Sequence, residues 1–232
     1  MGGEVDEMLV KNWMSKPAIT VNADTRLADA ANLLQKHEIQ RLPVMEGDRL
    51  VGIVTDQDIQ HALVPEPASL KSPKRPNNGL QKAVREFMTI SPITISENQT
   101  IEGASEMLLF HRISGMPVIN QAIEVVGMIT RSDLLRFILT VIGMGKEGIQ
   151  FAFELIDRPG SINEVTDLMR EYGGRIGTVF STRVRAPNGY RQAYIHTYDI
   201  DQPSLVRLKE ELSGKGKTLY IINERERISE II

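Results

Sequence analysis

Two pairs of residues in this 232-residue sequence combine a hydroxyl group with a carboxylate at the same short spacing. Thr55 precedes Asp58 in the segment GIVTDQD, and Thr130 precedes Asp133 in the segment GMITRSD. A Thr three residues before an acidic residue is typical of a capping box, which satisfies unpaired N–H groups at a helix start. The same helix end can also receive a phosphate, while the carboxylate accepts bonds from ribose hydroxyls. Spacing alone favours the capping box and leaves a ligand site open.

Both pairs lie in an internal repeat. Met14 recurs as Met88, 74 positions later, and Gly52 recurs as Gly127, 75 positions later after a one-residue insertion. A unit of this length buries too little apolar surface to fold alone, so two copies packed sheet to sheet are expected to form one domain. The predicted domain covers residues 8–142, with copy one at 8–64, a linker at 65–80 and copy two at 81–142.

Each copy predicts the element order β-α-β-β-α. In copy one a short strand at residues 18–21 precedes a helix that begins near Leu27, where small and apolar residues follow a helical period. Two apolar strands and a second helix near Asp56 complete the copy. Thr25, and Thr100 in the second copy, are placed to cap the first helices.

The pattern changes from residue 149 onward. The segment IQFAFELI alternates as a strand, and the following segment predicts a helix with Ser161 and Glu164 as a capping box and Gly173 as its stop. The remaining segments give the order β-α-β-β-α-β, a ferredoxin-like unit at residues 149–224. Residues 143–148 are expected to be a hinge, and the whole chain is expected to be an α+β protein.

Composition excludes several classes of function. A net charge of −3 gives no basic field for nucleic acid or a membrane surface, and the absence of cysteine excludes disulfides and thiolate metal sites. The four histidines lack the spacing of a zinc site, and no motif of a nucleophile with its base is present. We therefore expect a cytoplasmic protein with no metal and no enzymatic activity.

The duplicated pattern resembles the cystathionine-β-synthase-type (CBS) domain pair, whose copies end in Gly-apolar-x-Thr/Ser-x-x-Asp/Asn. The resemblance covers residues 10 to about 139. It implies two clefts between the copies for an adenine nucleotide, AMP or ATP first, with NAD or S-adenosylmethionine as alternatives. The first implied cleft uses Ile19, Thr20, Arg41, Leu42, Pro43, Thr55 and Asp58. The second uses Ile93, Thr94, Gly115, Met116, Pro117, Thr130, Arg131 and Asp133.

The two implied clefts differ in charge. Arg131 follows Thr130 and is a good phosphate partner, whereas Asp56 follows Thr55 and would repel a phosphate. Arg41 stands in copy one where copy two has Gly115. We hypothesise that the cleft with Arg131 prefers a phosphorylated ligand and that the other binds less strongly or takes adenosine.

The last third resembles an ACT domain, a ferredoxin-like regulatory module that often binds amino acids, through the segment DRPGSI between the first strand and first helix. The resemblance implies an amino acid site, with Asp157 and Asn163 holding the amino group. The implied residues are Asp157, Gly160, Ser161, Ile162 and Asn163. A CBS pair followed by such a module resembles the acetoin utilisation protein B family.

Together these resemblances imply a ligand-sensing regulatory protein, at least a homodimer, that acts on an unidentified partner protein. Two alternatives stay open. One is a structural dimerisation adaptor with empty clefts, and the other is an enzyme that acts on a nucleotide phosphate.

Overall fold

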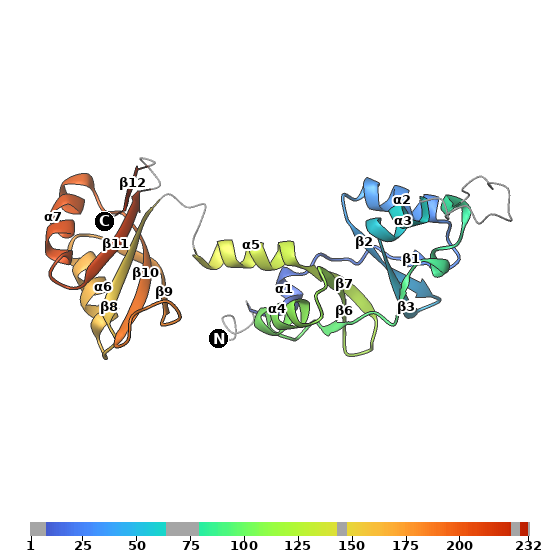
Figure 1. Ribbon diagram of the computed structural model, residues 1–232, viewed down its shortest axis with the longest axis horizontal. Coiled ribbons are helices and arrows are strands. Elements are labelled where there is room, and N and C mark those ends of the chain that lie inside the picture. The colour runs from blue at the N-terminus through green and yellow to red at the C-terminus, as the bar shows by residue number, and fades with distance from the viewer. Residues whose placement is uncertain (1–7, 64–78, 143–147, 224–227, 232) are drawn as a thin grey trace, which may run out of the picture. The chain divides into compact units, whose positions relative to one another are not determined.

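The computed structural model describes residues 8–63, 79–142, 148–223 and 228–231 (Figure 1). Most of the expected linker, and residues 143–147 of the hinge expected at 143–148, lie outside them. The chain divides into two compact units, Met1–Leu135 and Arg136–Ile232. The division falls within helix α5 (Arg131–Ile142).

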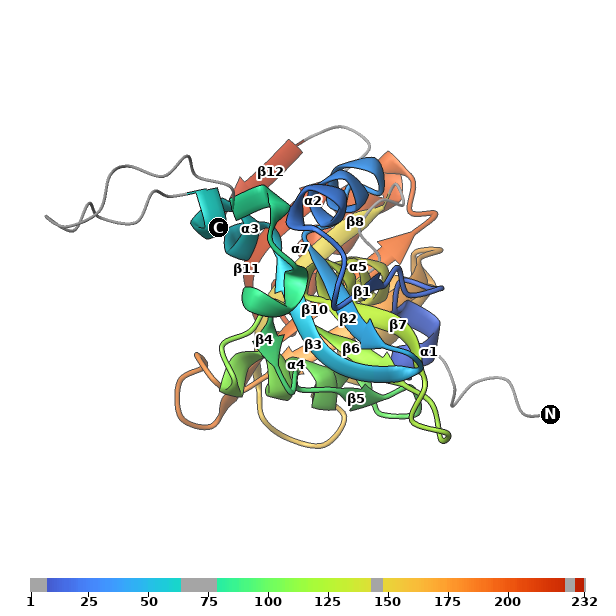
Figure 2. The ribbon, with the colours of Figure 1, turned by 90° about the vertical axis from the view of Figure 1, so that its right-hand side faces the viewer.

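The first unit contains the two predicted copies. Copy one consists of β1 (Val21–Asn22), α2 (Leu27–Lys36), β2 (Arg41–Glu46), β3 (Arg49–Thr55) and α3 (Asp56–Leu63). Copy two consists of β5 (Ile95–Ser96), α4 (Ile101–Phe110), β6 (Gly115–Ile119), β7 (Val125–Thr130) and α5. In both, the first strand pairs parallel with the second, which pairs antiparallel with the third. The order β-α-β-β-α is confirmed, and the two sheets lie side by side (Figures 1 and 2).

The N-terminal segment of each copy pairs with the sheet of the other copy. Strand β4 (Thr89–Ile90), in the first part of copy two, pairs antiparallel with β3 and makes the first sheet β1-β2-β3-β4. Ser15, which precedes the first strand of copy one, forms a bridge to Met128 in β7. The segments that lead from these crossings into β1 and β5 therefore run between the copies, and neither copy is complete without the other.

Two glycines that recur in the repeat permit these crossings. A Cβ atom on Gly52 would lie 2.4 Å from the Sδ of Met88, and one on Gly127 would lie 2.7 Å from the Sδ of Met14. The same atom on Gly127 would lie 2.8 Å from the carbonyl oxygen of Ser15. Since real Cβ contacts are longer, a side chain at either position would displace its neighbours, and the recurring methionines are the side chains that fill the space.

Short helices extend the exchange between copies. Helix α1 (Val10–Trp13) begins with an amide that donates to the carbonyl of Gln99, directly before α4. The 3-10 helices η1 (Gly79–Gln81) and η2 (Val84–Glu86) lie between α3 and β4, and the amide of Val84 donates to the carbonyl of Thr25 at 2.8 Å. Thr100 caps α4 as predicted, whereas the cap predicted for Thr25 is wrong, because Arg26 takes the cap position of α2 and no side chain caps it.

The second unit contains the strands β8 (Ile149–Ile156), β9 (Arg175–Thr182), β10 (Tyr190–Tyr198), β11 (Lys217–Asn223) and β12 (Ile228–Ile231) with helices α6 (Ser161–Glu171) and α7 (Gln202–Leu212). The sheet order is β12-β11-β8-β10-β9, with every neighbouring pair antiparallel. The first six elements follow the predicted order β-α-β-β-α-β, and β12 is an additional strand that the sequence did not predict.

Alternate residues of β8 build the core of this unit. Phe151 and Phe153 are fully buried and pack with Val165 and Met169 of α6 and Leu208 of α7. Both helices therefore cover the same face of the sheet (Figure 1). Gly173 has a φ of +83° directly after the helix cap and ends α6 as predicted. The capping box predicted for Ser161 is wrong, because Gly160 is the cap residue and Ser161 is the first residue of the helix.

Candidate functional site

The two Thr–Asp pairs form capping boxes at the starts of α3 and α5. Thr55 Oγ1 donates to Asp58 Oδ2 at 2.7 Å, and the amide of Asp58 donates back to Thr55 Oγ1 at 3.2 Å. The corresponding distances for Thr130 and Asp133 are 2.6 and 3.4 Å. The backbone amide of each threonine also donates to the same Oδ2. The capping role predicted from the spacing is confirmed, and in both copies it uses the same carboxylate oxygen.

The two boxes differ in exposure. Asp133 is only 2% exposed, whereas Asp58 is half-buried. A buried carboxylate requires bonded partners to offset its desolvation, so the environment of Asp133 is the more constrained of the two. The two copies therefore differ in the burial of the aspartate as well as in the charge of the residue that follows the threonine.

Arg41, at the start of β2, reaches from copy one to copy two. Its Nη1 donates to the carbonyl oxygen of Ser114 at 2.8 Å, and its Nη2 donates to Ser114 Oγ at 2.6 Å. A Cβ atom on Gly115 would lie 2.2 Å from Arg41 Nη1, so glycine at that position leaves room for the guanidinium. The resemblance to CBS pairs implied that Arg41 belongs to the first cleft. In the structure its guanidinium lies against copy two.

Four charged residues gather around this contact, and we call them the central charge cluster: Arg41, Asp56, Arg131 and Asp133. Burial lowers the pKa of Arg41, and the neighbouring Arg131 lowers it further, while Asp56 and Asp133 oppose the shift. Residues from both copies therefore share one electrostatic environment. The sequence singled out these residues separately, and the fold brings them together.

The other implied cleft residues fall into two groups. Leu42 and Met116 are fully buried, and Pro43 and Pro117 are buried beside them in β2 and β6, so a ligand would reach the backbone of these strands rather than the two large side chains. Four residues lie in the segments that cross between the copies and are half-buried or exposed: Ile19, Thr20, Ile93 and Thr94.

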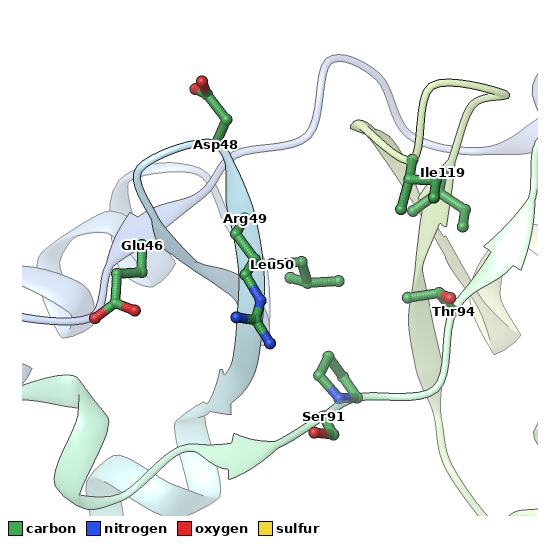
Figure 3. A pocket seen from close by; sticks show the side chains of 9 residues that line it. Glu46, Asp48, Arg49, Leu50, Ser91, Thr94 and Ile119 are labelled. Atoms are coloured by element: carbon green, nitrogen blue, oxygen red, sulfur yellow. The ribbon is translucent and has the colours of Figure 1, made fainter.

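A pocket of about 660 Å³ opens between the copies at the hairpin ends of their sheets (Figure 3). Leu50 points into it from copy one, and Thr94 and Ile119 point into it from the other side. Its lining residues are Glu46, Asp48, Arg49, Leu50, Ser91, Pro92, Thr94, Ile119 and Ile123. The volume lies within the range of small-molecule sites, about 300 to 1,000 Å³. Only Thr94 belongs to the residues implied from the sequence, because the two hairpins carry no shared motif.

The turn between β8 and α6 lines a second pocket, of about 430 Å³. All five residues implied for an amino acid site line it: Asp157, Gly160, Ser161, Ile162 and Asn163. Arg183 and Arg191 line it too, and the sequence analysis missed them. Pairing of β10 with β8 places Arg191 opposite Leu155, and pairing of β9 with β10 brings the end of β9 beside it. Only the strand register could have identified the two arginines.

Both arginines hold Asp157. Arg183 donates through Nε to Oδ2 and through Nη2 to Oδ1, the latter at 3.1 Å. Arg191 Nε lies 2.9 Å from Oδ1 as an ion pair without hydrogen-bond alignment. The hydrogen bonds from Arg183 lower the pKa of Asp157, and the charge of Arg191 adds to the shift.

Comparison with known proteins identifies the first unit. The family model described as "CBS domain" matches residues 10–65 and 84–140. A CBS domain-containing protein from Dictyostelium discoideum is 35% identical over 144 residues, which cover 59% of this chain and 94% of that protein. This chain belongs to the CBS domain family. The family match ends at residue 140 within α5, so it covers the two copies, and the residues from β8 onward lie outside it.

Two solved structures are similar to part of this chain. The CBS domain pair of protein MJ0100, in complex with 5'-methylthioadenosine and S-adenosyl-L-methionine, is 34% identical, covers 56% of this chain and 94% of its own, and has a TM-score of 0.47. A putative acetoin utilization protein from Vibrio cholerae is 22% identical, covers 59% of this chain and 93% of its own, and has a TM-score of 0.49.

Among residues 8–63, 79–142, 148–223 and 228–231, no helix is both long and apolar enough to cross a membrane. In the same part of the chain, no group of three or more histidine, aspartate or glutamate residues is arranged to hold a metal ion.

Proposed function

We propose that this CBS domain protein is a regulatory protein without catalytic activity, and that it binds an adenine-containing ligand between its two copies. The bonds from Arg41 to Ser114 carry the proposal, because they hold a half-buried cation of one copy against the other. A guanidinium can donate two parallel bonds to a phosphate. A phosphate that replaced Ser114 as the partner of Arg41 would therefore be bound by both copies at once.

The proposed ligand residues are the two sets implied by the CBS resemblance, with one change. Arg41 is assigned to the side of copy two, together with Arg131, because both guanidinium groups belong to the central charge cluster. The backbone of β2 and β6 would contact the adenine ring, and Asp58 or Asp133 would accept from the ribose. The cleft with Arg131 is therefore proposed to bind a phosphorylated ligand more tightly than the other.

The charge of the cluster favours AMP over ATP. Two arginines and two aspartates sum to about zero, so the additional phosphates of ATP would meet Asp56 and Asp133 as well as the two cations. NAD and S-adenosylmethionine are kept as alternative ligands, since each contains the adenosine group on which the proposed contacts depend.

Regulation is proposed to follow from a population shift. A ligand that contacts both copies stabilises one arrangement of the pair, by no more than the difference in its affinity for the two arrangements. The second unit is proposed to be an ACT-type domain, since its sheet order and its turn pocket fit that module, and a small ligand is proposed to bind at the turn. We further propose that the protein forms a homodimer and regulates an unidentified partner protein. The order of its two modules resembles that of the acetoin utilisation protein B family.

A structural adaptor is the second candidate, and one observation favours it. The capping boxes satisfy Thr55 and Thr130 through Asp58 and Asp133, so the helix starts need no ligand to complete them. An adaptor would show no stabilisation by any small molecule.

Thermal unfolding of the whole chain with AMP, ADP, ATP, NAD, S-adenosylmethionine and 5'-methylthioadenosine separates the candidates. A ligand that binds only the folded state at 100 times its Kd adds about 2.7 kcal/mol to the free energy of unfolding and raises the Tm. We expect the largest increase with AMP. No increase with any member of the panel would favour the adaptor, and chromatographic detection of a converted nucleotide after incubation would instead favour an enzyme.

A further inference from the structure

The pocket at the turn between β8 and α6 is rich in cations. Three arginines line it, Arg158, Arg183 and Arg191, while Asp157 is the one carboxylate among the described residues of its lining. Arg158 is paired with Glu164, which lies outside the lining, through a contact of 2.7 Å. Even with Glu164 included, the turn keeps an excess of one positive charge.

The single carboxylate is already occupied. Both oxygens of Asp157 contact guanidinium groups, with Arg183 on Oδ2 and Oδ1 and Arg191 on Oδ1. A ligand ammonium group would have to displace these arginines or approach Asp157 beside them. The pocket therefore opposes the amino group that an amino acid would bring.

Hydrogen-bond donors at the same place lack acceptors. Helix α6 has 11 residues, and its cap residue Gly160, with a φ of +86°, carries no side chain to accept from the first turn. Ser161 lines the pocket and is only 6% exposed, and its Oγ makes no hydrogen bond with any described residue. A buried hydroxyl without a partner is costly, so a ligand oxygen that accepted from it would remove that cost.

We propose that this pocket binds a small oxyanion, the carboxylate or phosphate of a ligand that carries no ammonium group. The helix start and the arginines supply donors and positive charge on one concave surface, and the Ser161 hydroxyl is buried in its wall. This inference rests on the sensing role proposed for the second unit and replaces an amino acid by an anion as its ligand. It is independent of nucleotide binding between the CBS copies.

Amide shifts of the whole ¹⁵N-labelled chain test the inference, with Gly160 and Ser161 as reporters. The probes are L-lactate, L-alanine and inorganic phosphate, titrated to about 10 mM to resolve a Kd near 1 mM. Lactate and alanine share a carbon skeleton and a carboxylate, and they differ in a hydroxyl against an ammonium group. We expect lactate or phosphate to bind at least about ten-fold more tightly than alanine. The relative response to lactate and phosphate tells a carboxylate ligand from a phosphate ligand. Alanine binding as tightly as the tighter of lactate and phosphate, or no shift with any probe, would overturn the inference.

Variants assign the binding to the proposed groups. Arg191→Gln and Ser161→Ala should each weaken the tighter-binding anion, Arg191→Gln by about ten-fold. Arg170→Gln is the matched control, because Arg170 lies on α6, pairs with Asp167 and does not line the pocket. Unchanged anion affinity in both Arg191→Gln and Ser161→Ala would refute the assignment. AMP titrations of the same variants should be unaffected, because the nucleotide is proposed to bind between the CBS copies. If a variant lost AMP binding but kept its anion affinity, the result would count against the nucleotide proposal and not against the anion site.

Discussion

Arg41 and Ser114 are 73 residues apart in the chain, and two hydrogen bonds join them across the two CBS copies. The contact is formed between the first residue of β2 and the residue directly before β6. Arg41 also belongs to the central charge cluster. The same side chain therefore holds the two copies together and contributes a positive charge to the proposed ligand site.

Replacing Arg41 tests this double role. Arg41→Ala should lower the free energy of unfolding by about 1 kcal/mol, because two hydrogen bonds from a charged but half-buried group are lost. The same change should weaken AMP by about ten-fold if the guanidinium binds the phosphate. Calorimetric titration with AMP and adenosine separates the two effects, since only AMP carries the phosphate. Lys36→Ala, at the exposed end of α2, is the control and should change neither quantity. An equal loss of affinity for AMP and adenosine would contradict a phosphate contact.

The crossing of segments between the copies depends on Gly52 and Gly127. Each change to alanine should destabilise the protein by about 1 to 3 kcal/mol, because the added methyl group has no space. Gly127→Ala should cost more, since a backbone oxygen of Ser15 lies in its way, whereas the flexible Met88 side chain meets the methyl group at position 52. Chemical denaturation measures both.

Two further variants make the test specific. Met88→Ala should recover part of the stability lost by Gly52→Ala, since it removes the side chain that the new methyl group meets. Gly214→Ala serves as the control, because its nearest neighbour would lie at an ordinary 3.6 Å. Equal losses at Gly52, Gly127 and Gly214 would show that close approach is not the cause.

The repeat and its elements could be predicted because hydrophobic period and turn residues are local signals. The exchange of segments could not, because pairing of Ile90 with Gly52 depends on contacts between distant parts of the chain. The same reason explains why Arg183 and Arg191 were missed, since only the register of β8, β9 and β10 brings them to Asp157.

The caps give a finer measure of what local sequence determines. Thr100 caps α4, but Thr25 does not cap α2, because the residue 74 positions before Thr100 is Arg26, which takes the cap position without a side-chain bond. The backbone carbonyl of Thr25 instead accepts from Val84 of the crossing segment. At the start of α6, Gly160 adopts a left-handed conformation and takes the cap position from Ser161. At α2 the threonine lies one residue before the cap position, and at α6 a left-handed glycine takes that position, so neither local motif forms the predicted cap.

The ion pairs of Asp157 predict a dependence of stability on pH. Its pKa in the folded protein lies below the usual value of 3.8, chiefly because Arg183 donates hydrogen bonds to the charged form. A lowered folded pKa contributes stability that is fully present above the unfolded value and is lost as the pH falls through the folded value. The Tm of Asp157→Asn should therefore fall less than that of the parent chain between about pH 5 and pH 3. Asp167→Asn, on the exposed face of α6, controls for the loss of one surface carboxylate. Parallel Tm curves for parent and Asp157→Asn would contradict the prediction.

Asp58 and Asp133 provide the most direct test of the proposed inequality between the clefts. Both cap a helix in the same way, so Asp58→Ala and Asp133→Ala should each lower the free energy of unfolding by about 0.5 to 2 kcal/mol. Their effects on the ligand should differ, because Asp133 belongs to the central charge cluster with Arg41 and Arg131, whereas Asp58 follows Asp56 in an α3 start without an adjacent arginine. We expect Asp133→Ala to weaken AMP by about ten-fold or more and Asp58→Ala to weaken it by less. Thr55→Ser and Thr130→Ser keep the hydroxyl that closes each box and serve as controls for the cap. Equal losses of AMP affinity from the two aspartate variants, measured by titration calorimetry on chains shown to be folded, would mean that the clefts are equivalent and that Arg131 does not select a phosphate.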